Sequence, residues 1–489
     1  MSLAKIVDII HSTDRKDWTI RNVEAFDSLF GSDGGRYPQN AKADIQTRAP
    51  DVDGSDFVQY AAYIHSSNPK SGRYRGLSFV MFPAEGRPCL FGLVVGTDGL
   101  APDEAVLGRP GHARKAQAIC SWLNSIAGAP TQVAWAKQDP TRTDLSIPED
   151  VQQEWPEYRR IFSRYGKEVY AVYAPTANRE LTAQAAAAFL DLMIEERGSQ
   201  PLTAFKSESA KIRESWFGHL MPTVESTEVS GLLTKRRYVI LQGPPGTGKT
   251  KMAVDLLNKT YQGFGRSIQF HANTTYENFV GGLAPVQTSG ELGLRFAPTR
   301  GFLMEAAAQA MANPTKPYLL HIDEINRADL GKVLGEAIFL LEANDAPRKV
   351  DLPYDFGEPF RRQFSLPPNL HILGTMNSAD RSIALVDVAV RRRFAFVSLW
   401  PNIQPVVQFG CDYTVEAYRK LVSIFIEHAS DEAFSLVPGH SYFLESDPAS
   451  ARKSLKVNLA PLLDEYLAQG YVTGFGEPIR SYLQWLRAQ

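Results

Sequence analysis

The chain has 489 residues, of which 44% are hydrophobic and 22% are charged, and its formal net charge is −2. This length exceeds one ordinary hydrophobic core, so two or three domains are expected. The composition is typical of globular proteins, and no apolar run approaches the ~18 residues that cross a bilayer. The small net charge excludes nucleic-acid binding by bulk charge alone, so any such contact needs a local basic patch.

The N-terminus and the cysteines indicate the compartment. The first residues, MSLAKIVDIIHSTDRKDW, are amphipathic and lack the apolar core and cleavage site of a signal peptide. Cys89, Cys120 and Cys411 lie far apart without metal-ligand spacing, which is typical of reduced thiols. We therefore expect a cytoplasmic protein without a membrane segment.

Residues 1–200 are predicted to form an α+β domain. The apolar runs 76–82 and 89–95 flank a turn-forming segment, as in a hairpin. Residues 112–126 and 182–196 have helical spacing. The sequence RGSQP then predicts a boundary, followed by a partly helical connector over residues 201–234.

The remaining chain is predicted to hold two further regions. From Tyr238 it alternates strand, loop and helix, which predicts an α/β core with a mostly parallel sheet over residues 235–400. Residues 401–489 place apolar residues at three- and four-residue steps, which predicts a helical lid.

The core begins with a complete phosphate-binding loop. An apolar strand over residues 238–241 precedes GPPGTGKT, and a helix is expected over residues 251–258. Glycines let backbone N–H groups turn inward on a phosphate, and the helix N-terminus adds its positive end. A turn without a ligand is the alternative, which the combination of strand, lysine, threonine and helix disfavours. The expected nucleotide contacts are Gly243, Pro244, Pro245, Gly246, Thr247, Gly248, Lys249, for the outer phosphates, and Thr250, whose hydroxyl would also bind Mg²⁺.

Two later strands end in polar side chains. The strand 318–322 leads into Asp323, which suits the Mg²⁺ shell, and Glu324, which suits polarising the attacking water. The strand 371–375 leads to Asn377, whose amide can hold that water. The alternatives are a solvated turn for the two carboxylates and a capping role for Asn377.

Three consecutive arginines, 391–393, follow the apolar segment VDVAV. Arginine stabilises charge on a transferring phosphoryl group, so one or more could act on a neighbouring subunit's nucleotide. The alternative is a solvated basic helix end that the helix dipole favours.

The order of the motifs resembles McrB-like AAA+ motor subunits of modification-dependent (type IV) restriction systems. The resemblance covers about residues 235–470, and its motifs are GPPGTGKT, HANTTYENFVGGLAP, HIDEINRADLGKVLGEAIFLLE, GTMNSADRSIALVDVAVRRRF, PGHSYF and APLLDEY. It implies an AAA+ P-loop NTPase core with a helical lid beside a separate N-terminal domain. It also implies a hexameric ring with nucleotide at the subunit interfaces, GTP as the preferred nucleotide with Mg²⁺, and a separately encoded McrC-like nuclease partner.

The resemblance also implies roles for single residues. Ser378 stands where the family often has threonine, a mild change because the hydroxyl is kept. The chain has no Asn-Lys-x-Asp motif of Ras-like GTPases, so ATP stays open as the nucleotide. By motif position, the resemblance implies that Lys249 contacts phosphate, that Thr250 and Asp323 bind Mg²⁺, and that Glu324 activates the water. It implies that Asn377 senses the water or the γ-phosphate, and that Asn326 lies near the partner-stimulated site. It also implies that Asp380 belongs to a nucleotide-handling segment and that Arg392 and Arg393 are the interface arginines.

In this family the N-terminal domain is exchangeable and reads the target, often modified DNA. Basic side chains could contact phosphates, and aromatic ones could stack on a flipped base. The alternative is solvated basic loops around an ordinary aromatic core. No acidic-lysine nuclease pattern stands out, so we expect that this chain does not cut DNA. The basic candidates are Lys70, Arg73, Arg75, Arg109, His112, Arg114 and Lys115, and the aromatic ones are Trp18, Tyr60, Tyr63, Tyr74, Trp122 and Trp135.

The sequence thus predicts the NTP-hydrolysing motor, with GTP favoured, of a McrBC-like DNA restriction complex. A MoxR-like protein-remodelling chaperone would share the phosphate loop and the Asp-Glu-Ile-Asn-Arg strand end. It is disfavoured by the segment 377–380 and by the three arginines. A non-motor sensor is disfavoured by Glu324, which indicates hydrolysis.

Overall fold

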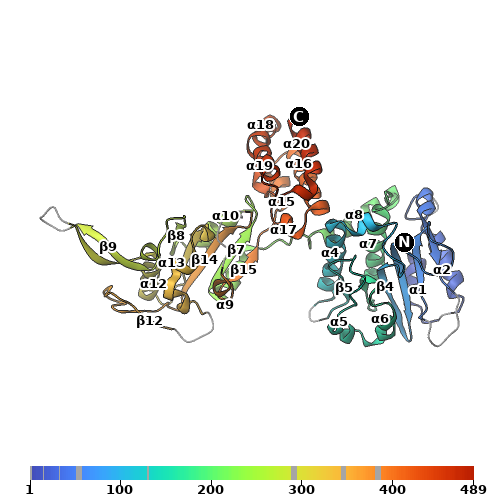
Figure 1. Cartoon of the computed structure of the whole chain (residues 1–489), viewed down its shortest axis with the longest axis horizontal. Coiled ribbons are helices and arrows are strands. Elements are labelled where there is room, and N and C mark those ends of the chain that lie inside the picture. Colours follow the sequence, from blue (N-terminus) through green and yellow to red (C-terminus); the bar gives the residue numbers. More distant parts are fainter. Residues whose placement is uncertain are drawn as a thin grey trace. The chain divides into compact units, whose positions relative to one another are not determined.

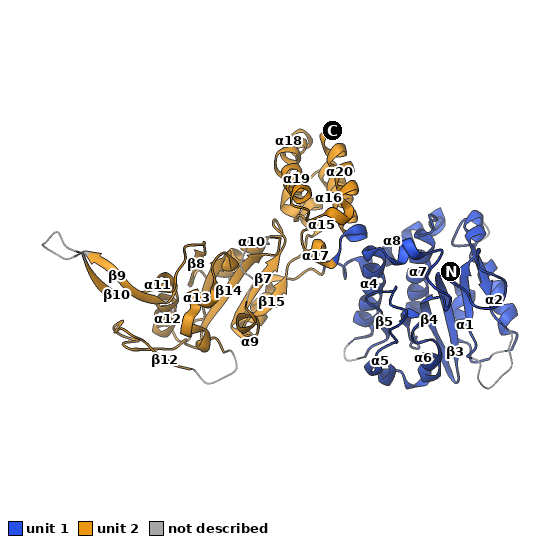
Figure 2. Cartoon of the chain, viewed as in Figure 1, with its two compact units in different colours: residues 1–221, 426–430 blue, residues 222–425, 431–489 orange. Residues whose placement is uncertain are grey.

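A computed structural model describes residues 3–14, 16–31, 34–50, 58–128, 131–287, 294–342, 348–379 and 387–488. The chain divides into two compact units (Figure 2), of which the first holds Met1–Met221 with Ile426–Ser430 and the second holds Pro222–Phe425 with Asp431–Gln489. The division falls inside the segment 201–234 that the sequence predicts to be a connector. Within the described ranges, no helix is both long and apolar enough to span a membrane.

The first unit is built on a six-stranded antiparallel sheet in the order β1-β2-β3-β4-β6-β5. The predicted hairpin is its centre, with Leu77 opposite Val95 and Phe82 opposite Leu90. Its strands are β1 (Ile45–Arg48), β2 (Ala61–His65), β3 (Leu77–Ala84), β4 (Arg87–Val95), β5 (Ala134–Ala136) and β6 (Val169–Tyr173).

Helices cover both faces of this sheet, because its central strands are apolar on both sides. Phe82 and its neighbours share one core with Phe162. On the opposite face, the ring centroids of Phe91 and Phe189 lie 6.4 Å apart. The helices are α1 (Ala4–His11), α2 (Trp18–Asp27), α3 (Glu104–Leu107), α4 (Pro110–Ala127), α5 (Glu149–Glu154), α6 (Arg159–Tyr165), α7 (Arg179–Glu195) and α8 (Thr203–Phe217).

A buried ion pair ties three segments of the first unit together. Arg36 is fully buried, and its Nε and Nη2 donate to the two carboxylate oxygens of Asp191 on α7 at 2.7 and 2.6 Å. The Tyr37 and Ser209 hydroxyls donate to the same carboxylate at 2.6 and 2.7 Å. The carboxylate is thus saturated with hydrogen bonds, the condition under which a buried charge is tolerated.

The second unit contains a five-stranded sheet in the order β15-β7-β14-β11-β8, in which every pair is parallel. The α/β core with a parallel sheet is therefore confirmed. Tyr238 and Ile240 of β7 join the core on one face, and Val239 and Leu241 join the core on the other. Burial on both faces explains why these strands are continuous apolar runs. The strands are β7 (Tyr238–Gly243), β8 (Gly265–Gln269), β11 (Tyr318–Asp323), β14 (Leu370–Asn377) and β15 (Ala395–Ser398).

Helices cover each face of the parallel sheet (Figure 1). The core on the face of Tyr238 and Ile240 includes α12 and α13, and the core on the face of Val239 and Leu241 includes α9 and α10. Two antiparallel hairpins, β9–β10 and β12–β13, are added to this core. The bounds are α9 (Ser226–Arg236), α10 (Lys249–Asp255), α11 (Tyr276–Phe279), α12 (Phe302–Ala312), α13 (Leu330–Leu334), α14 (Val388–Arg391), β9 (Gly281–Gln287), β10 (Leu294–Arg300), β12 (Val350–Asp351) and β13 (Gln363–Phe364).

The chain after β15 is helical, as the sequence predicts for residues 401–489. A π-helical turn, Leu455–Leu459, leads into α19, and a second one, Leu256–Thr260, follows α10. The helices are α15 (Ile403–Phe409), α16 (Asp412–His428), α17 (Asp431–Phe434), α18 (Pro448–Ser454), α19 (Ala460–Ala468) and α20 (Gly476–Ala488).

Candidate functional site

The phosphate-binding loop joins β7 to α10, in the strand–loop–helix setting that the sequence predicts. Gly246 and Gly248 have φ of +82° and +87°, which is the left-handed region that favours glycine. A Cβ on Gly246 would lie 2.5 Å from the Oγ of Ser441, so the loop has no room for a side chain there. The helix begins at Lys249, which directs its N-terminal N–H groups toward the loop.

Lys249 is buried beneath this loop. Its Nζ donates to the carbonyl oxygens of Gly243 at 2.9 Å and Pro244 at 2.7 Å. Burial lowers the pKa of Lys249 to about 8, while Glu324 and Asp323 act in the opposite direction. The ammonium thus keeps its charge near neutral pH and gives it up more readily than an exposed lysine.

Asp323 lies at the carboxyl end of β11 beside the first turn of α10. Its Oδ1 accepts a hydrogen bond from the Thr250 hydroxyl at 3.0 Å and another from the Thr375 hydroxyl of β14. Adjacent ligands of an octahedral Mg²⁺ with bonds of about 2.1 Å lie about 3 Å apart. The oxygens of Thr250 and Asp323 therefore fit a shared Mg²⁺ in both chemistry and spacing.

Glu324 follows in a strained conformation. It has φ of +52° and ψ of 45°, a left-handed backbone that is unusual for a residue other than glycine. Its Oε1 accepts from the amide of Asn377 at 2.8 Å, and its Oε2 lies 3.3 Å from Nε of Arg327. The Thr375 hydroxyl accepts from the Glu324 backbone N–H at 3.4 Å. The turn after β11 is thus held by the end of β14, which aims the carboxylate.

A segment of the lid packs directly on the loop. The Gly439 N–H donates to the Pro245 carbonyl at 2.9 Å, and the Ser441 N–H donates to the Gly246 carbonyl at 3.0 Å. A Cβ on Gly439 would lie 2.0 Å from the carbonyl carbon of Gly246. The PGHSYF motif therefore brings lid and loop together.

Two cavities meet at the loop. The first, of 300 Å³, is lined by the loop, Asp323, Glu324, the end of β14 and Ser441. The second, of 340 Å³, lies on the other side of Gly248 and Lys251, which line both. Its charged lining residues are Glu225, Asp255, Lys251 and Lys259, and its polar ones include Asn402 and His440. Together the cavities offer a polar, cation-bearing compartment beside a wider one, the arrangement that a triphosphate joined to a base requires.

The two arginines predicted for a subunit interface differ in exposure. The Arg392 side chain is 67% exposed, whereas that of Arg393 is 7% exposed. Arg393 donates to the Ala389 carbonyl at 2.7 Å and lies 3.4 Å from the carboxylate of Glu342. Arg393 is thus held within its own fold, and Arg392 is the solvent-accessible one of the two.

Other predicted residues are placed as follows. The Ser378 hydroxyl donates to the Ser435 carbonyl at 3.1 Å, and its N–H donates to the Gly243 carbonyl at 3.0 Å, so it links the loop to the lid side. Asn326 is buried, 5% exposed, directly after the Glu324 turn. Asp380 lies outside the described residues.

Some of the N-terminal candidate residues are held in ion pairs or in the core, and others line a cavity. Arg109 and Lys115 pair with the buried carboxylate of Glu196 at 2.7 and 3.1 Å, and His112 is buried beside it. Arg75 pairs with Asp98. Four of the aromatic candidates are buried core residues, namely Trp18, Tyr63, Tyr74 and Trp122. Arg73, Tyr60 and Tyr74 line one cavity of 330 Å³.

Sequence reasoning missed Thr375 and the second cavity. Thr375 contacts both Asp323 and Glu324, and its position two residues before Asn377, on the strand next to β11, was the available signal. The residues of the second cavity come from four separate segments, so no local pattern groups them.

Comparisons with known proteins agree with this geometry. The family model for AAA domains of the dynein-related subfamily matches residues 238–394. The type IV methyl-directed restriction enzyme EcoKMcrB subunit of Escherichia coli is 33% identical, over 53% of this chain and 60% of that protein. A component of the type II restriction enzyme BsuMI of Bacillus subtilis is 29% identical, over 33% of this chain and 56% of that protein.

The chain spans less than two thirds of the length of these two relatives. Among solved structures, a variant of RuvB from Thermotoga maritima is 13% identical, with a TM-score of 0.27, over 51% of this chain and 78% of that one. Residues 238–394 thus match an AAA domain, and the chain is similar to components of two restriction enzymes.

Proposed function

We propose that this chain is the NTP-hydrolysing motor of a DNA restriction complex, with GTP as the favoured nucleotide. The proposal rests on the polar side chains that line the first cavity. The Thr250 hydroxyl donates to Asp323 at 3.0 Å, and the Asn377 amide donates to Glu324 at 2.8 Å. Hydroxyl, carboxylate and amide at the ends of neighbouring parallel strands are the groups that phosphoryl transfer to water requires.

Each of these side chains has a distinct proposed task. Thr250 and Asp323 would hold Mg²⁺, which would neutralise charge on the phosphates. Lys249, with the loop's N–H groups, binds the outer phosphates. Glu324 accepts a proton from the attacking water, and Asn377 orients both the water and the Glu324 carboxylate. The backbone strain at Glu324 is consistent with a catalytic position, where such strain concentrates.

The second cavity would take the base. Guanine presents adjacent N–H donors, and the carboxylates of Glu225 and Asp255 in this cavity can accept them. This favours GTP, in line with the resemblance to McrB. Asp380 stays a proposed nucleotide contact by motif position.

The proposed assembly is a hexameric ring in which Arg392 of one subunit reaches the nucleotide of its neighbour. Its exposure supports this role, and the burial of Arg393 disfavours that residue for it. The N-terminal unit would bind target DNA, and a McrC-like partner would supply the nuclease. The two restriction relatives support this setting.

Steady-state hydrolysis of GTP and of ATP by the purified chain tests the nucleotide assignment. We expect a higher kcat/KM for GTP, loss of turnover in Lys249→Ala, and normal turnover in Lys332→Ala, a matched lysine whose side chain is 85% exposed. Higher kcat/KM for ATP would overturn the choice of base. No turnover with either nucleotide, in the presence of DNA and the partner, would overturn the proposal of a motor.

A second test separates restriction from protein remodelling. A McrC-like nuclease partner should stimulate hydrolysis and should cut DNA only with this chain and a hydrolysable nucleotide. Stimulation by unfolded protein, and none by DNA or the nuclease, would instead favour a MoxR-like remodelling role.

A further inference from the structure

The lid segment 439–441 contacts the phosphate-binding loop and reaches the cavities on both sides of it. The backbone N–H groups of Gly439 and Ser441 donate to two carbonyl oxygens of the loop, at 2.9 and 3.0 Å. Ser441 lines the first cavity, and His440 lines the second. The lid therefore places one polar side chain in each cavity, and the proposed hydrolysis assigns no task to His440.

The His440 ring carries its proton on Nε2. The backbone N–H of Asn402 donates to Nδ1 of His440 at 3.3 Å, and because a backbone N–H can only donate, Nδ1 is the acceptor. Burial, and after it the charge of Lys251, lower the pKa of His440, which favours the neutral ring. In a neutral imidazole one nitrogen accepts and the other donates, so Nε2 is an N–H donor.

This donor faces the phosphate-binding loop at Gly248. Nε2 lies 3.7 Å from the position that a Cβ on Gly248 would take. In the part of the chain that the structure describes, Nε2 has no hydrogen-bond partner. Gly248 and Lys251 line both cavities, so they mark the place where a nucleotide would pass from one cavity to the other. His440 thus offers a free donor at that place.

We infer that His440 is a lid contact to the nucleotide and that its Nε2–H donates to the α-phosphate. The α-phosphate joins the outer phosphates to the nucleoside, so it would lie where the two cavities meet. A hydrogen bond to a charged phosphate oxygen is stronger than one between neutral groups. The inference rests on the proposed function, in which the two cavities share one nucleoside triphosphate. The nucleotide would then be held by the core and the lid together.

Two variants of similar size test the donor. His440→Met fills the space of the ring without an N–H, whereas His440→Gln offers an amide N–H at a similar distance from the backbone. Equilibrium binding to the full chain with Mg²⁺ is measured for three probes of the preferred base: a non-hydrolysable triphosphate, the diphosphate and the 2′,3′-dideoxy diphosphate. All three carry the α-phosphate, so His440→Met should weaken each of them about tenfold. His440→Gln should retain most of the affinity.

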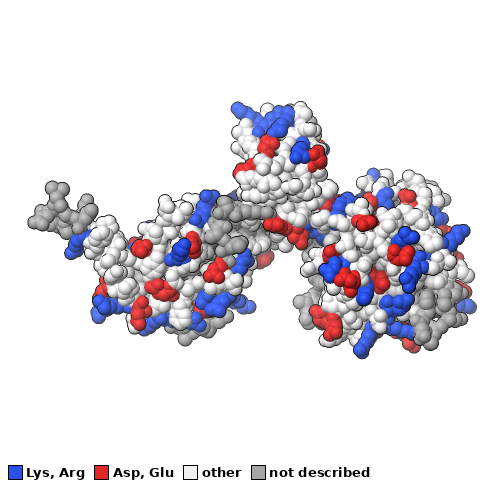
Figure 3. All heavy atoms as spheres, viewed as in Figure 1, with Lys and Arg blue, Asp and Glu red and all other residues white. Residues whose placement is uncertain are grey.

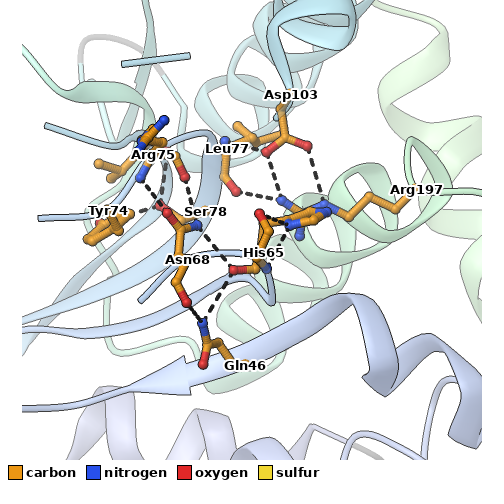
Figure 4. A network of polar contacts seen from close by, with 11 residues as sticks. Gln46, His65, Asn68, Tyr74, Arg75, Leu77, Ser78, Asp103 and Arg197 are labelled. Atoms are coloured by element: carbon orange, nitrogen blue, oxygen red, sulfur yellow. Dashed lines mark hydrogen bonds and ion pairs between the residues drawn. The ribbon is translucent and has the colours of Figure 1, made fainter. Parts of the chain in front are cut away.

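His65→Met is the matched control, in the first unit (Figure 4). Gln46 and Asn68 donate to the backbone carbonyl of His65, at 3.5 and 3.1 Å, so these bonds do not require the ring. On the face visible in Figure 3, basic and acidic side chains are interspersed over this unit, so that face offers a triphosphate no surface of a single sign. Binding of the three probes should therefore be unchanged in His65→Met.

The outcomes separate this inference from the proposed function. If His440→Met binds all three probes like the unmodified chain, the contact is overturned while the proposed function stands. A loss confined to the triphosphate would place Nε2 at the outer phosphates, and a loss absent with the dideoxy probe would place it at the ribose. Either result overturns the assignment to the α-phosphate.

Two further results would count against the N–H donor. An equal loss in His440→Gln and His440→Met would indicate a packing effect, and a changed preference between guanine and adenine diphosphates would indicate a contact to the base. If the unmodified chain binds none of the probes, the proposed function fails and the inference fails with it. Unchanged melting temperatures without nucleotide show that each variant is folded.

Discussion

The two units place the residues that line their cavities in different ways. In the second unit, Asp323 and Asn377 end neighbouring parallel strands, so the order of strands in the sheet brings them to the same edge. In the first unit, Tyr60, Phe82 and Tyr165 come from a loop, a strand and a helix that are distant in the chain. A site of the first kind leaves short motifs in the sequence, whereas a site of the second kind becomes visible only in the folded chain.

The largest expected effect concerns the candidate nucleotide site of the second unit. Glu324→Gln keeps the shape and the hydrogen bond to Asn377 but removes the base, so kcat should fall about 10³-fold while nucleotide binding is retained. The measurement is steady-state hydrolysis beside equilibrium binding of a fluorescent nucleotide. Glu305→Gln is the matched control, since that carboxylate is exposed and pairs with Arg266 on the surface. Normal turnover in Glu324→Gln would remove the water-activating role from this residue.

The second effect concerns the arginine pair. Arg392→Ala should lower turnover about 10²-fold in the assembled ring without lowering nucleotide affinity, because it removes charge stabilisation supplied by a neighbour. Arg393→Ala should chiefly lower the melting temperature, because Arg393 bonds Ala389 and Glu342 within its own subunit.

Mixing two inactive variants tests whether Arg392 acts between subunits. In mixed rings of Glu324→Gln and Arg392→Ala, some interfaces combine an intact Glu324 with an intact Arg392. Turnover should therefore rise above that of either variant alone. No recovery in rings shown to be mixed would place the function of Arg392 within its own subunit.

The third effect turns to the first unit and its buried ion pair. Asp191→Asn removes the buried counter-charge of Arg36 and leaves only the half-exposed Glu208 carboxylate at 3.5 Å, so this unit should lose about 3 kcal/mol of stability. Urea unfolding followed by amide exchange in α7 and α8 measures the loss. Asp144→Asn, in an exposed pair with Arg142, should change little. If NTP turnover falls in parallel with exchange protection in Asp191→Asn, the units do not act as separately as their compact division indicates.

The sequence predicted secondary-structure elements better than side-chain environments. The hairpin of β3 and β4 and the parallel core follow from apolar periodicity and from turn residues, which are local signals. The exposure of Arg392 and the burial of Arg393 depend on packing against Glu342, which lies in a distant segment. The contact of Gly439 with Gly246 likewise depends on how the lid folds back on the loop. Such contacts between distant segments were not available from residue patterns.

The smallest expected effect is on the pH dependence of nucleotide binding. Burial lowers the pKa of Lys249 to about 8, so the ammonium that binds phosphate is present below pH 8 and is lost as the pH rises above it. The affinity for a non-hydrolysable triphosphate should therefore fall above pH 8, by at most about tenfold per pH unit. Lys249→Arg keeps its charge across this range, and whatever its absolute affinity, its profile should be flat.

A flat triphosphate profile in the unmodified chain would mean that the Lys249 ammonium holds its proton throughout. In that case the carboxylates of Glu324 and Asp323 would outweigh the burial of Lys249.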